Sequence, residues 1–303
     1  MSRYKLRANY DIENIDSQKM DGTVIVDVPM LSNGELNYGL SHIKKKLYEE
    51  NVYPSEIGFD IMSLATMVYM ADTRIERVVH GQDSWTREIE LEIPVSNVEI
   101  WDSQIRTVER MLKFLTGDLW KITLSSRAWQ FNNLEEVREK SNKYDEVSLF
   151  SGGMDSLIST INLMENKKNT LLISHAGEGL TKNAQKNIVN KFDLLYPDVL
   201  HTWLDLWMVF PRDYIPAGGN DNNTRSRSFL FIGYALFAMT GMDNINELLV
   251  PENGLIALNV PLDETRVGSF STRTTHPFYL SLWNELLVGL GLNLSVKKPY
   301  WNK

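Results

Sequence analysis

Residues 146–156 read EVSLFSGGMDS, and this stretch decides the fold. Its apolar part, residues 147–150, predicts a short buried strand, and residues 156–165 continue with a helical pattern. Between them, Gly152 and Gly153 permit a tight turn that directs backbone N–H groups toward an anion, and the following helix adds the positive end of its dipole. The stretch therefore predicts a phosphate-binding loop between a strand and a helix.

The side chains of this loop suit a nucleotide that is bound with a divalent metal ion. Ser151 and Ser156 carry hydroxyl groups that can donate to phosphate oxygens. Asp155 would repel a phosphate directly, so a carboxylate here indicates Mg²⁺ between it and a pyrophosphate. The chain contains neither GxxxxGK[ST] nor GxGxxG. The loop resembles the SGGxDS loop of the PP-loop ATP pyrophosphatases, and a Ser/Gly surface turn is the alternative interpretation.

From residue 146 onward, strand-like and helix-like segments alternate. Strands are expected over residues 146–150, 170–175, 199–206 and 247–251, and helices over 156–166, 181–196, 225–240 and 277–290. This alternation predicts a Rossmann-like α/β fold, with a parallel sheet that has helices on both faces. Ligands of such sheets bind beyond the carboxyl ends of the strands, which is where the predicted phosphate loop lies.

The first half of the chain mixes the two periodicities. Residues 86–93 alternate glutamate with isoleucine or leucine, except at their start, which predicts a half-buried strand ended by Pro94. Residues 105–115 show helical apolar spacing, and Gly117 closes that helix. The other expected elements are a strand at 23–28, a helix at 59–70 and a loop at 79–85.

The polar residues 132–145 are the best candidate for a domain boundary, although a solvated helix is an equal alternative. We predict a smaller N-terminal α+β domain, residues 1–140, that recognises a partner or the substrate. The ATP-binding domain would follow over residues 146–303.

Composition excludes several classes of protein. The 31 basic and 39 acidic residues give a net charge of −8, which argues against nucleic acid or an anionic membrane as the main partner. The chain has no cysteine, so disulfides, thiol catalysis and cysteine-bound zinc are excluded. Its start lacks the apolar core of a signal peptide, and the apolar run 229–242 is too short for a membrane helix. We expect a cytoplasmic protein.

Polar residues after the other expected strands complete the candidate site. Ser174 and His175 follow the second strand and are assigned to the nucleotide, with an ordinary rim histidine as the alternative for His175. Arg225 and Arg227 begin a helix, where cations oppose the dipole, so a bound anion is favoured over a solvated pair. The residues assigned to the substrate follow the strand expected at 247–251. They are Glu252, Asn253, Asp263, Arg273, Thr274 and His276.

Three features together resemble the 7-cyano-7-deazaguanine synthase family of PP-loop enzymes. They are SLFSGGMDS at 148–156, the arginine-led RSRSFL at 225–230, and PENG at 251–254 before a long polar loop. This resemblance covers about residues 146–303. The first half, with ADTRIER at 71–77 and FLTGD at 114–118, resembles the extra N-terminal domain of members encoded in bacterial anti-phage defence operons.

The resemblance implies an ATP- and Mg²⁺-dependent ligase. ATP would adenylate the carboxylate of a 7-carboxy-7-deazaguanine-like acid with release of pyrophosphate, and ammonia or a protein amine would then attack the acyl adenylate. In the roles implied by the family, Ser151, Gly152, Gly153 and Ser156 hold the pyrophosphate, Asp155 holds Mg²⁺, and Arg225 or Arg227 stabilises the developing phosphate charge. Other proteins of the defence operon are the expected partners, and a homodimer stays open.

The family also implies a zinc subdomain near its C-terminus, which this cysteine-free chain cannot supply. Either the chain is truncated or the subdomain is missing. Two functional alternatives remain at this point. One is another PP-loop enzyme of the tRNA-modifying or amidotransferase type, and the other is a catalytically silent ATP-binding scaffold in a defence complex.

Overall fold

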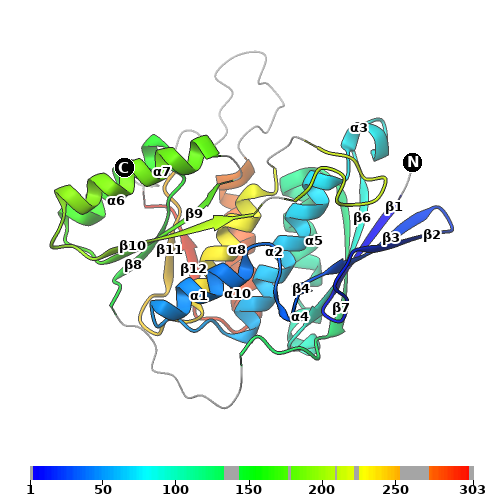
Figure 1. The fold of residues 1–303 in the computed structure, drawn as a ribbon, viewed down its shortest axis with the longest axis horizontal. Coiled ribbons are helices and arrows are strands. Elements are labelled where there is room, and N and C mark those ends of the chain that lie inside the picture. The colour runs from blue at the N-terminus through cyan, green and yellow to red at the C-terminus, as the bar shows by residue number, and fades with distance from the viewer. Residues whose placement is uncertain are drawn as a thin grey trace.

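The computed structural model describes residues 3–132, 143–176, 179–208, 210–221, 225–252 and 273–299. Within these ranges the strands form two five-stranded sheets and one two-stranded hairpin, β4 (Leu31–Ser32) with β5 (Glu35–Leu36). Figure 1 shows the two large sheets on opposite sides of the molecule, with several helices between them. The chain is thus a mixed α/β protein with parallel sheets flanked by helices, as expected.

The N-terminal sheet has the strand order β2-β3-β1-β6-β7. Its strands are β1 (Arg3–Asn9), β2 (Asp16–Met20), β3 (Thr23–Pro29), β6 (Glu88–Val95) and β7 (Leu119–Ser126). Only the edge strand β2 is antiparallel to its neighbour. The expectation of an α+β arrangement here is therefore wrong, because helical crossovers connect β3 to β6 and β6 to β7 in parallel.

Those crossovers supply the helices of the first half. They are α1 (Leu40–Glu49), α2 (Glu56–Arg74), α3 (Arg77–His80), α4 (Val98–Asp102) and α5 (Ile105–Thr116). Gly117 ends α5 with a φ of 80°, as the sequence predicted. The segment predicted as a loop from residue 79 begins inside α3. Pro94 lies within β6, where β1 no longer pairs, so its missing N–H costs no hydrogen bond on that side.

The C-terminal sheet is wholly parallel, in the order β10-β9-β8-β11-β12. Its strands are β8 (Glu146–Leu149), β9 (Thr170–Ala176), β10 (His201–Trp207), β11 (Glu247–Leu249) and β12 (Ser295–Lys297). The chain runs from β8 outward through β9 to β10, and then places β11 on the other side of β8. The gap between β8 and β11 is therefore the topological switch point, where such sheets bind ligands.

Helices cover both faces of this sheet. The helices are α6 (Met154–Glu165), α7 (Gly179–Leu195), α8 (Arg227–Met239) and α10 (Pro277–Gly289), preceded by the short 3₁₀ helix η2 (Arg273–Thr275). On one face, Phe150 and Leu172 form a small apolar cluster with Phe192 of α7 and with side chains of α6. On the other face, α8 contacts β8 and β9, and α10 contacts β12.

One hydrophobic core joins the two sheets. It includes Leu91 of β6 and Val147 of β8, and α2 packs directly on α8 between them. A Cβ added at Gly233 of α8 would lie 2.9 Å from the Cβ of Ala65 of α2, so the glycine permits this close approach. The first half also contributes α1 to the C-terminal sheet, where it packs on β10. Among the described residues, the segments before and after the predicted boundary near residue 140 thus share one hydrophobic core.

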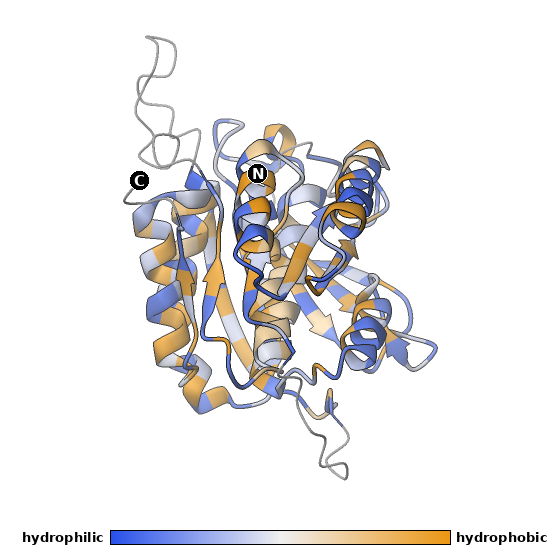
Figure 2. Cartoon of the chain, turned by 90° about the vertical axis from the view of Figure 1, so that its left-hand side faces the viewer, coloured by the Kyte–Doolittle hydropathy of each residue, from blue (hydrophilic) through white to orange (hydrophobic). Residues whose placement is uncertain are grey.

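Hydropathy follows this layering. Figure 2 shows hydrophobic residues along the strands and the inner helices, and hydrophilic residues in the connecting segments. The apolar run near residue 230 forms α8, a helix of 13 residues that lies in the core. Among the described residues, no helix has both the length and the apolar character needed to cross a membrane.

Candidate functional site

The predicted phosphate loop lies at the carboxyl end of β8 and leads directly into α6. Gly152 has a φ of 83°, a left-handed conformation that a side chain would strain. Gln185 of α7 donates from Nε2 to the carbonyl oxygen of Ser151 at 3.0 Å and holds the turn from the side. Gly153 is the N-cap of α6, and no side chain caps the helix there. The first N–H groups of α6 therefore remain suited to an anion.

The two serines of the loop bond within it. The hydroxyl of Ser156 donates to the carbonyl oxygen of Gly153 at 2.9 Å and accepts from the N–H of Gly152 at 3.2 Å. Ser151 Oγ accepts from the N–H of Gly153 at 3.3 Å. Ser156 is buried and Ser151 is exposed. These bonds hold the loop in its turned shape, and the predicted contacts of both hydroxyls with a phosphate stay predictions.

Asp155 and Glu252 converge at the switch point. Asp155 lies in the first turn of α6 after β8, and Glu252 follows β11, the neighbouring strand. Burial raises the pKa of Glu252, the negative charge of Asp155 raises it further, and the charge of Lys298 opposes the rise. The charges of these two residues, which the sequence assigned to different roles, one to the metal and one to the substrate, therefore interact.

Lys298 completes this group and was not assigned from the sequence. It follows β12, so it lies at the same edge of the sheet as the phosphate loop. Burial lowers its pKa to about 8, although the nearby Glu252 acts in the opposite direction. His276, the N-cap of α10, has a lowered pKa because of burial and the charge of Lys298. The only signal in the sequence that could have identified Lys298 is its position just after the short strand β12.

Ser174 and His175 lie at the end of β9 but face inward. Trp203 donates from Nε1 to Ser174 Oγ at 2.6 Å, and the Ser174 side chain is fully buried. Burial, with the charge of Arg227, lowers the pKa of His175 to about 4, so its ring is neutral near pH 7. The ring packs edge-on against Tyr69 at 5.4 Å. As placed, both side chains have structural partners, and their assignment to the nucleotide stays a prediction.

Arg225 and Arg273 donate hydrogen bonds to backbone carbonyl groups at the C-terminal end of α5. Arg225 donates from Nη1 to the carbonyl oxygen of Thr116 at 2.8 Å, and Arg273 donates from Nη1 to that of Phe114 at 2.9 Å. Cations at this end of a helix are favoured by its dipole. Arg225 also lies 4.7 Å above the ring of Trp85. Burial lowers the pKa of both arginines.

Arg227 points elsewhere. It donates from Nη2 to the carbonyl oxygen of His175 at 2.9 Å, which ties the start of α8 to the end of β9. Of the two arginines assigned to catalysis, Arg227 is therefore the one that lies at the sheet edge. The remaining assigned residues are less informative, because Thr274 is half-buried in η2, and Asn253 and Asp263 lie outside the described residues.

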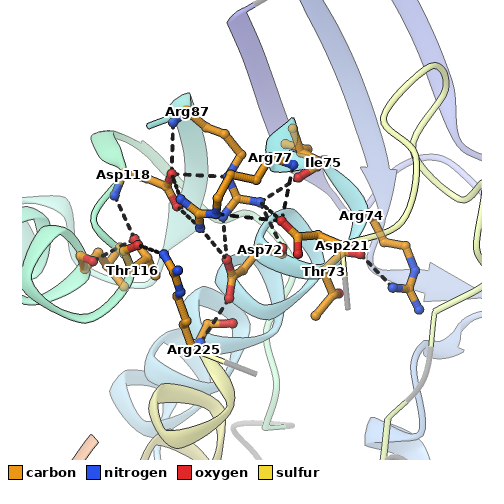
Figure 3. Close-up of polar contacts among 12 residues, drawn as sticks. Asp72, Thr73, Arg74, Ile75, Arg77, Arg87, Thr116, Asp118, Asp221 and Arg225 are labelled. Carbon is orange, nitrogen blue, oxygen red and sulfur yellow. Dashed lines mark hydrogen bonds and ion pairs between the residues drawn. The ribbon is translucent and has the colours of Figure 1, made fainter. Parts of the chain in front are cut away.

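A buried ionic network anchors the start of α8 to the first half of the chain (Figure 3). Asp72 of α2 accepts from the N–H of Ser226 at 3.0 Å and from Arg87 Nη2 at 2.5 Å. Arg87 also donates to Asp118 at 2.6 Å, and Arg77 donates to the same carboxylate at 2.7 Å. The anion expected near this arginine-led helix is therefore, at least in part, an internal carboxylate, Asp72.

Asp155 and Glu252 are the candidate ligands for the magnesium ion that the sequence predicts. Among the described residues, no group of three or more histidine, aspartate or glutamate side chains could hold a metal ion. Mg²⁺ is commonly held by one or two carboxylates together with substrate phosphates, and Asp155 with Glu252 offers that pair. Burial is the main cause of the raised pKa of Glu252, and a cation beside Asp155 and Glu252 would offset both this burial and their mutual repulsion.

Comparison with known proteins adds nothing to this picture. No protein-family model, curated protein or solved structure matches the chain. A function is therefore inferred from the residues of the site and from the motif resemblance of the loop.

Proposed function

We propose that the chain binds ATP with Mg²⁺ at the switch point between β8 and β11 and uses it to adenylate a carboxylic acid. The observation that carries this proposal is the position of the SGGMDS loop. It lies on the uncapped N-terminus of α6, at the carboxyl end of the central strand of a parallel sheet, beside Glu252. Backbone N–H groups and a helix dipole at that point favour a polyphosphate.

The surrounding side chains divide the remaining work. Asp155 and Glu252 would hold Mg²⁺, which supplies positive charge to the departing pyrophosphate when it is bound. Lys298 would add a cation near Glu252, and a bound phosphate would raise the pKa of Lys298 from about 8 and keep it charged. Arg227 lies at the end of β9, within reach of the edge where the nucleotide would lie.

The proposed reaction has two steps. A carboxylate oxygen of the acid attacks the α-phosphorus of ATP, and pyrophosphate leaves. An amine then attacks the acyl carbon, loses a proton, and expels AMP. The resemblance to 7-cyano-7-deazaguanine synthases suggests a 7-carboxy-7-deazaguanine-like acid, with ammonia or a partner-protein amine as the acceptor. A cytoplasmic role in anti-phage defence is part of the same proposal.

The test is pyrophosphate release from ATP and Mg²⁺ in the presence of 7-carboxy-7-deazaguanine. We expect release by the wild-type chain and a loss of roughly a thousandfold in Asp155→Asn, because the variant loses a carboxylate that would hold the metal. Glu165→Gln, at the other end of α6, is the matched control and should react normally.

Two results would count against the proposal. Wild-type turnover in Asp155→Asn would show that this carboxylate does not hold the metal. ATP binding without pyrophosphate release, even with the acid and an amine present, would favour the scaffold alternative. Circular dichroism should be unchanged in Asp155→Asn, since an amide in the first turn of a helix costs no more than about 1 kcal/mol.

A further inference from the structure

A cavity lies at the carboxyl ends of strands of the N-terminal sheet. Its volume is about 370 Å³, and it is bounded by the ends of β1, β6 and β7 and by the chain that follows β1 and β7. Small-molecule sites commonly have volumes of roughly 300–1,000 Å³, and parallel sheets place them at this edge. The side chains that matter below are Arg7, Asp11, Asp27, Glu92, Arg127 and Trp129, all of which line it.

This cavity is separate from the phosphate loop. Helix α2 connects the two regions, because its first residue, Glu56, bonds to Arg127 beside the cavity, whereas Asp72 bonds to Ser226 at the start of α8. Asp72 is sixteen positions after Glu56 in α2. At 1.5 Å of rise per residue, the two residues lie about 24 Å apart along the helix. None of the residues that line the cavity belongs to the phosphate loop.

The walls are held in place by packing and by ion pairs. The rings of Tyr10 and Trp129 are stacked, with centroids 5.5 Å apart and planes 12° from parallel. Tyr10 Oη is 3.0 Å from Ser63 Oγ of α2. Arg127 donates to Glu56 and to Asp60 of α2 at 2.8 Å each. Because the side made by Tyr10, Arg127 and Trp129 is tied to α2, and Arg7 is bonded to Asp27 on the sheet, the cavity is preformed and needs no folding step to receive a ligand.

The lining favours a cationic group. Arg7 is paired across the strands with Asp27 and Glu92, and its Nε donates to Asp27 at 2.8 Å. The side chain of Arg127 is only 1% exposed, and its charge is balanced by the acidic side chains of α2. Lys5 also pairs with Glu92 at 2.9 Å, so Asp11, Asp27 and Glu92 exceed the half-buried guanidinium of Arg7 and the ammonium of Lys5 by one negative charge. The ring of Trp129 adds a π face, which also attracts cations.

The guanidinium of Arg127 in the cavity wall has a donor that lacks an acceptor. Arg127 Nε is buried and has no hydrogen-bond partner among the described residues. Buried N–H groups are almost always paired, so an unpaired one needs an explanation. A carbonyl or carboxylate oxygen that enters the wall beside residues 127–129 would supply the acceptor. The ligand would then carry a cationic group and such an oxygen together.

We propose that this cavity binds a basic amino-acid residue, either as free lysine or arginine or within a peptide segment of a partner protein. The side-chain ammonium or guanidinium group lies against Glu92 and Asp27, and the carbonyl or carboxylate oxygen lies toward Arg127. This inference is independent of the proposed ATP chemistry, because none of the residues that carry it belongs to the phosphate site.

The test is isothermal titration calorimetry of the full chain with four probes. They are free L-lysine, free L-arginine, Nα-acetyl-L-lysine methylamide as a peptide mimic, and Nε-acetyl-L-lysine, which lacks the side-chain charge. We expect at least one of the first three to bind and the fourth not to bind. Glu92→Gln should weaken binding about tenfold or more, the loss typical of one charge-assisted hydrogen bond.

Glu88→Gln is the matched control, because Glu88 lies on the same face of the same strand and is paired with Arg3, away from the cavity. Its affinity should equal that of the wild type. Tighter binding of the methylamide than of free lysine and arginine identifies a peptide source, and the reverse identifies a free amino acid. The proposal is overturned if none of the three charged probes binds, if Nε-acetyl-lysine binds equally well, or if Glu88→Gln and Glu92→Gln behave alike.

Discussion

The two large sheets differ in what covers them. In the N-terminal sheet, α2 and α5 pack on one face, while the other carries a ladder of charges in which Lys5 pairs with Glu90 and Glu92. The C-terminal sheet has helices on both faces. The strand sequences reflect this, because β6 (EIELEIPV) alternates strictly in burial, whereas β9 (TLLISHA) is buried over residues 171–175. A one-sided parallel sheet thus has the pattern usually associated with antiparallel sheets.

Despite this difference, the sheets are not independent bodies. Helices α2 and α8 pack on each other between them, and the ionic network around Arg87 closes one end of that contact. This arrangement predicts that both sheets unfold together. It also changes the expectation for a fragment that begins near residue 140, because removal of α2 would expose the buried apolar side of α8.

The largest effect is expected from Arg87→Met. The side chain of Arg87 is 1% exposed and bonds to both Asp72 and Asp118, so its removal takes a guanidinium from two buried carboxylates and leaves Asp118 with Arg77 and Asp72 with the N–H of Ser226. Loss of one member of a buried ion pair typically costs about 3–5 kcal/mol. We expect a decrease of that size in the free energy of unfolding, measured by denaturant titration, in a single transition that includes both sheets.

The control is Arg3→Met, which removes the exposed pair with Glu88 and should cost less than about 1 kcal/mol. Hydrogen exchange can then compare the amides of Leu91 in β6 and Ile173 in β9. Equal destabilisation of both amides supports a shared core. Selective destabilisation of Leu91 would show that the two sheets are separate cooperative units.

The sequence predicted the C-terminal half better than the N-terminal half for a physical reason. Continuous apolar strands that alternate with amphipathic helices have few structural solutions, so the parallel sheet, its helices and the loop position followed directly. In the first half, the alternation in residues 86–93 identified a strand and its buried face. The alternation did not identify the direction of the neighbouring strands. That direction depends on the helical connection from β3 to β6, in which α1 packs on β10 of the C-terminal sheet.

The next effect concerns the edge of the C-terminal sheet and depends on pH. Burial first, and then the charge of Arg227, lowers the pKa of His175 to about 4 from 6.5. The unfolded chain therefore binds a proton below pH 6.5 that the folded chain refuses until about pH 4. Stability is lost as the pH falls through this window, by about 3 kcal/mol in total.

Denaturant titrations at pH 7, 5.5 and 4 measure this loss. His175→Gln removes the titrating ring and should flatten the curve in this window, whatever its own stability at pH 7. Acidic groups with raised pKa values, such as Asp60 and Glu252, act in the opposite direction and are present in both proteins. Identical pH profiles for the wild type and the variant would show that His175 is not buried in its neutral form.

The candidate site shows a similar division between what the sequence can and cannot predict. The loop motif is local, so its position between β8 and α6 could be predicted from eleven consecutive residues. The partners of the loop are not local. Glu252 interacts with Asp155, and Lys298 with Glu252, only because β11 and β12 continue the sheet beside β8. Asp72 reaches α8 only through the contact between α2 and α8. Strand order, which sets these contacts, is not encoded in spacing.

The smallest effect separates the two glycines of the loop, which the sequence could not distinguish. At Gly152, φ is 83° and an added Cβ would lie 2.9 Å from Gln185 Cγ, so Gly152→Ala should cost about 1–2 kcal/mol of stability. At Gly153, φ is −83° and the nearest atom to an added Cβ is Ser151 Oγ at 3.5 Å, so Gly153→Ala should cost only about 0.5 kcal/mol. The added methyl group would nevertheless stand at the N-cap of α6, where the phosphate is proposed to bind. Gly153→Ala should therefore melt almost like the wild type while losing ATP affinity. Unchanged ATP affinity in this variant would show that the phosphate does not bind at this loop.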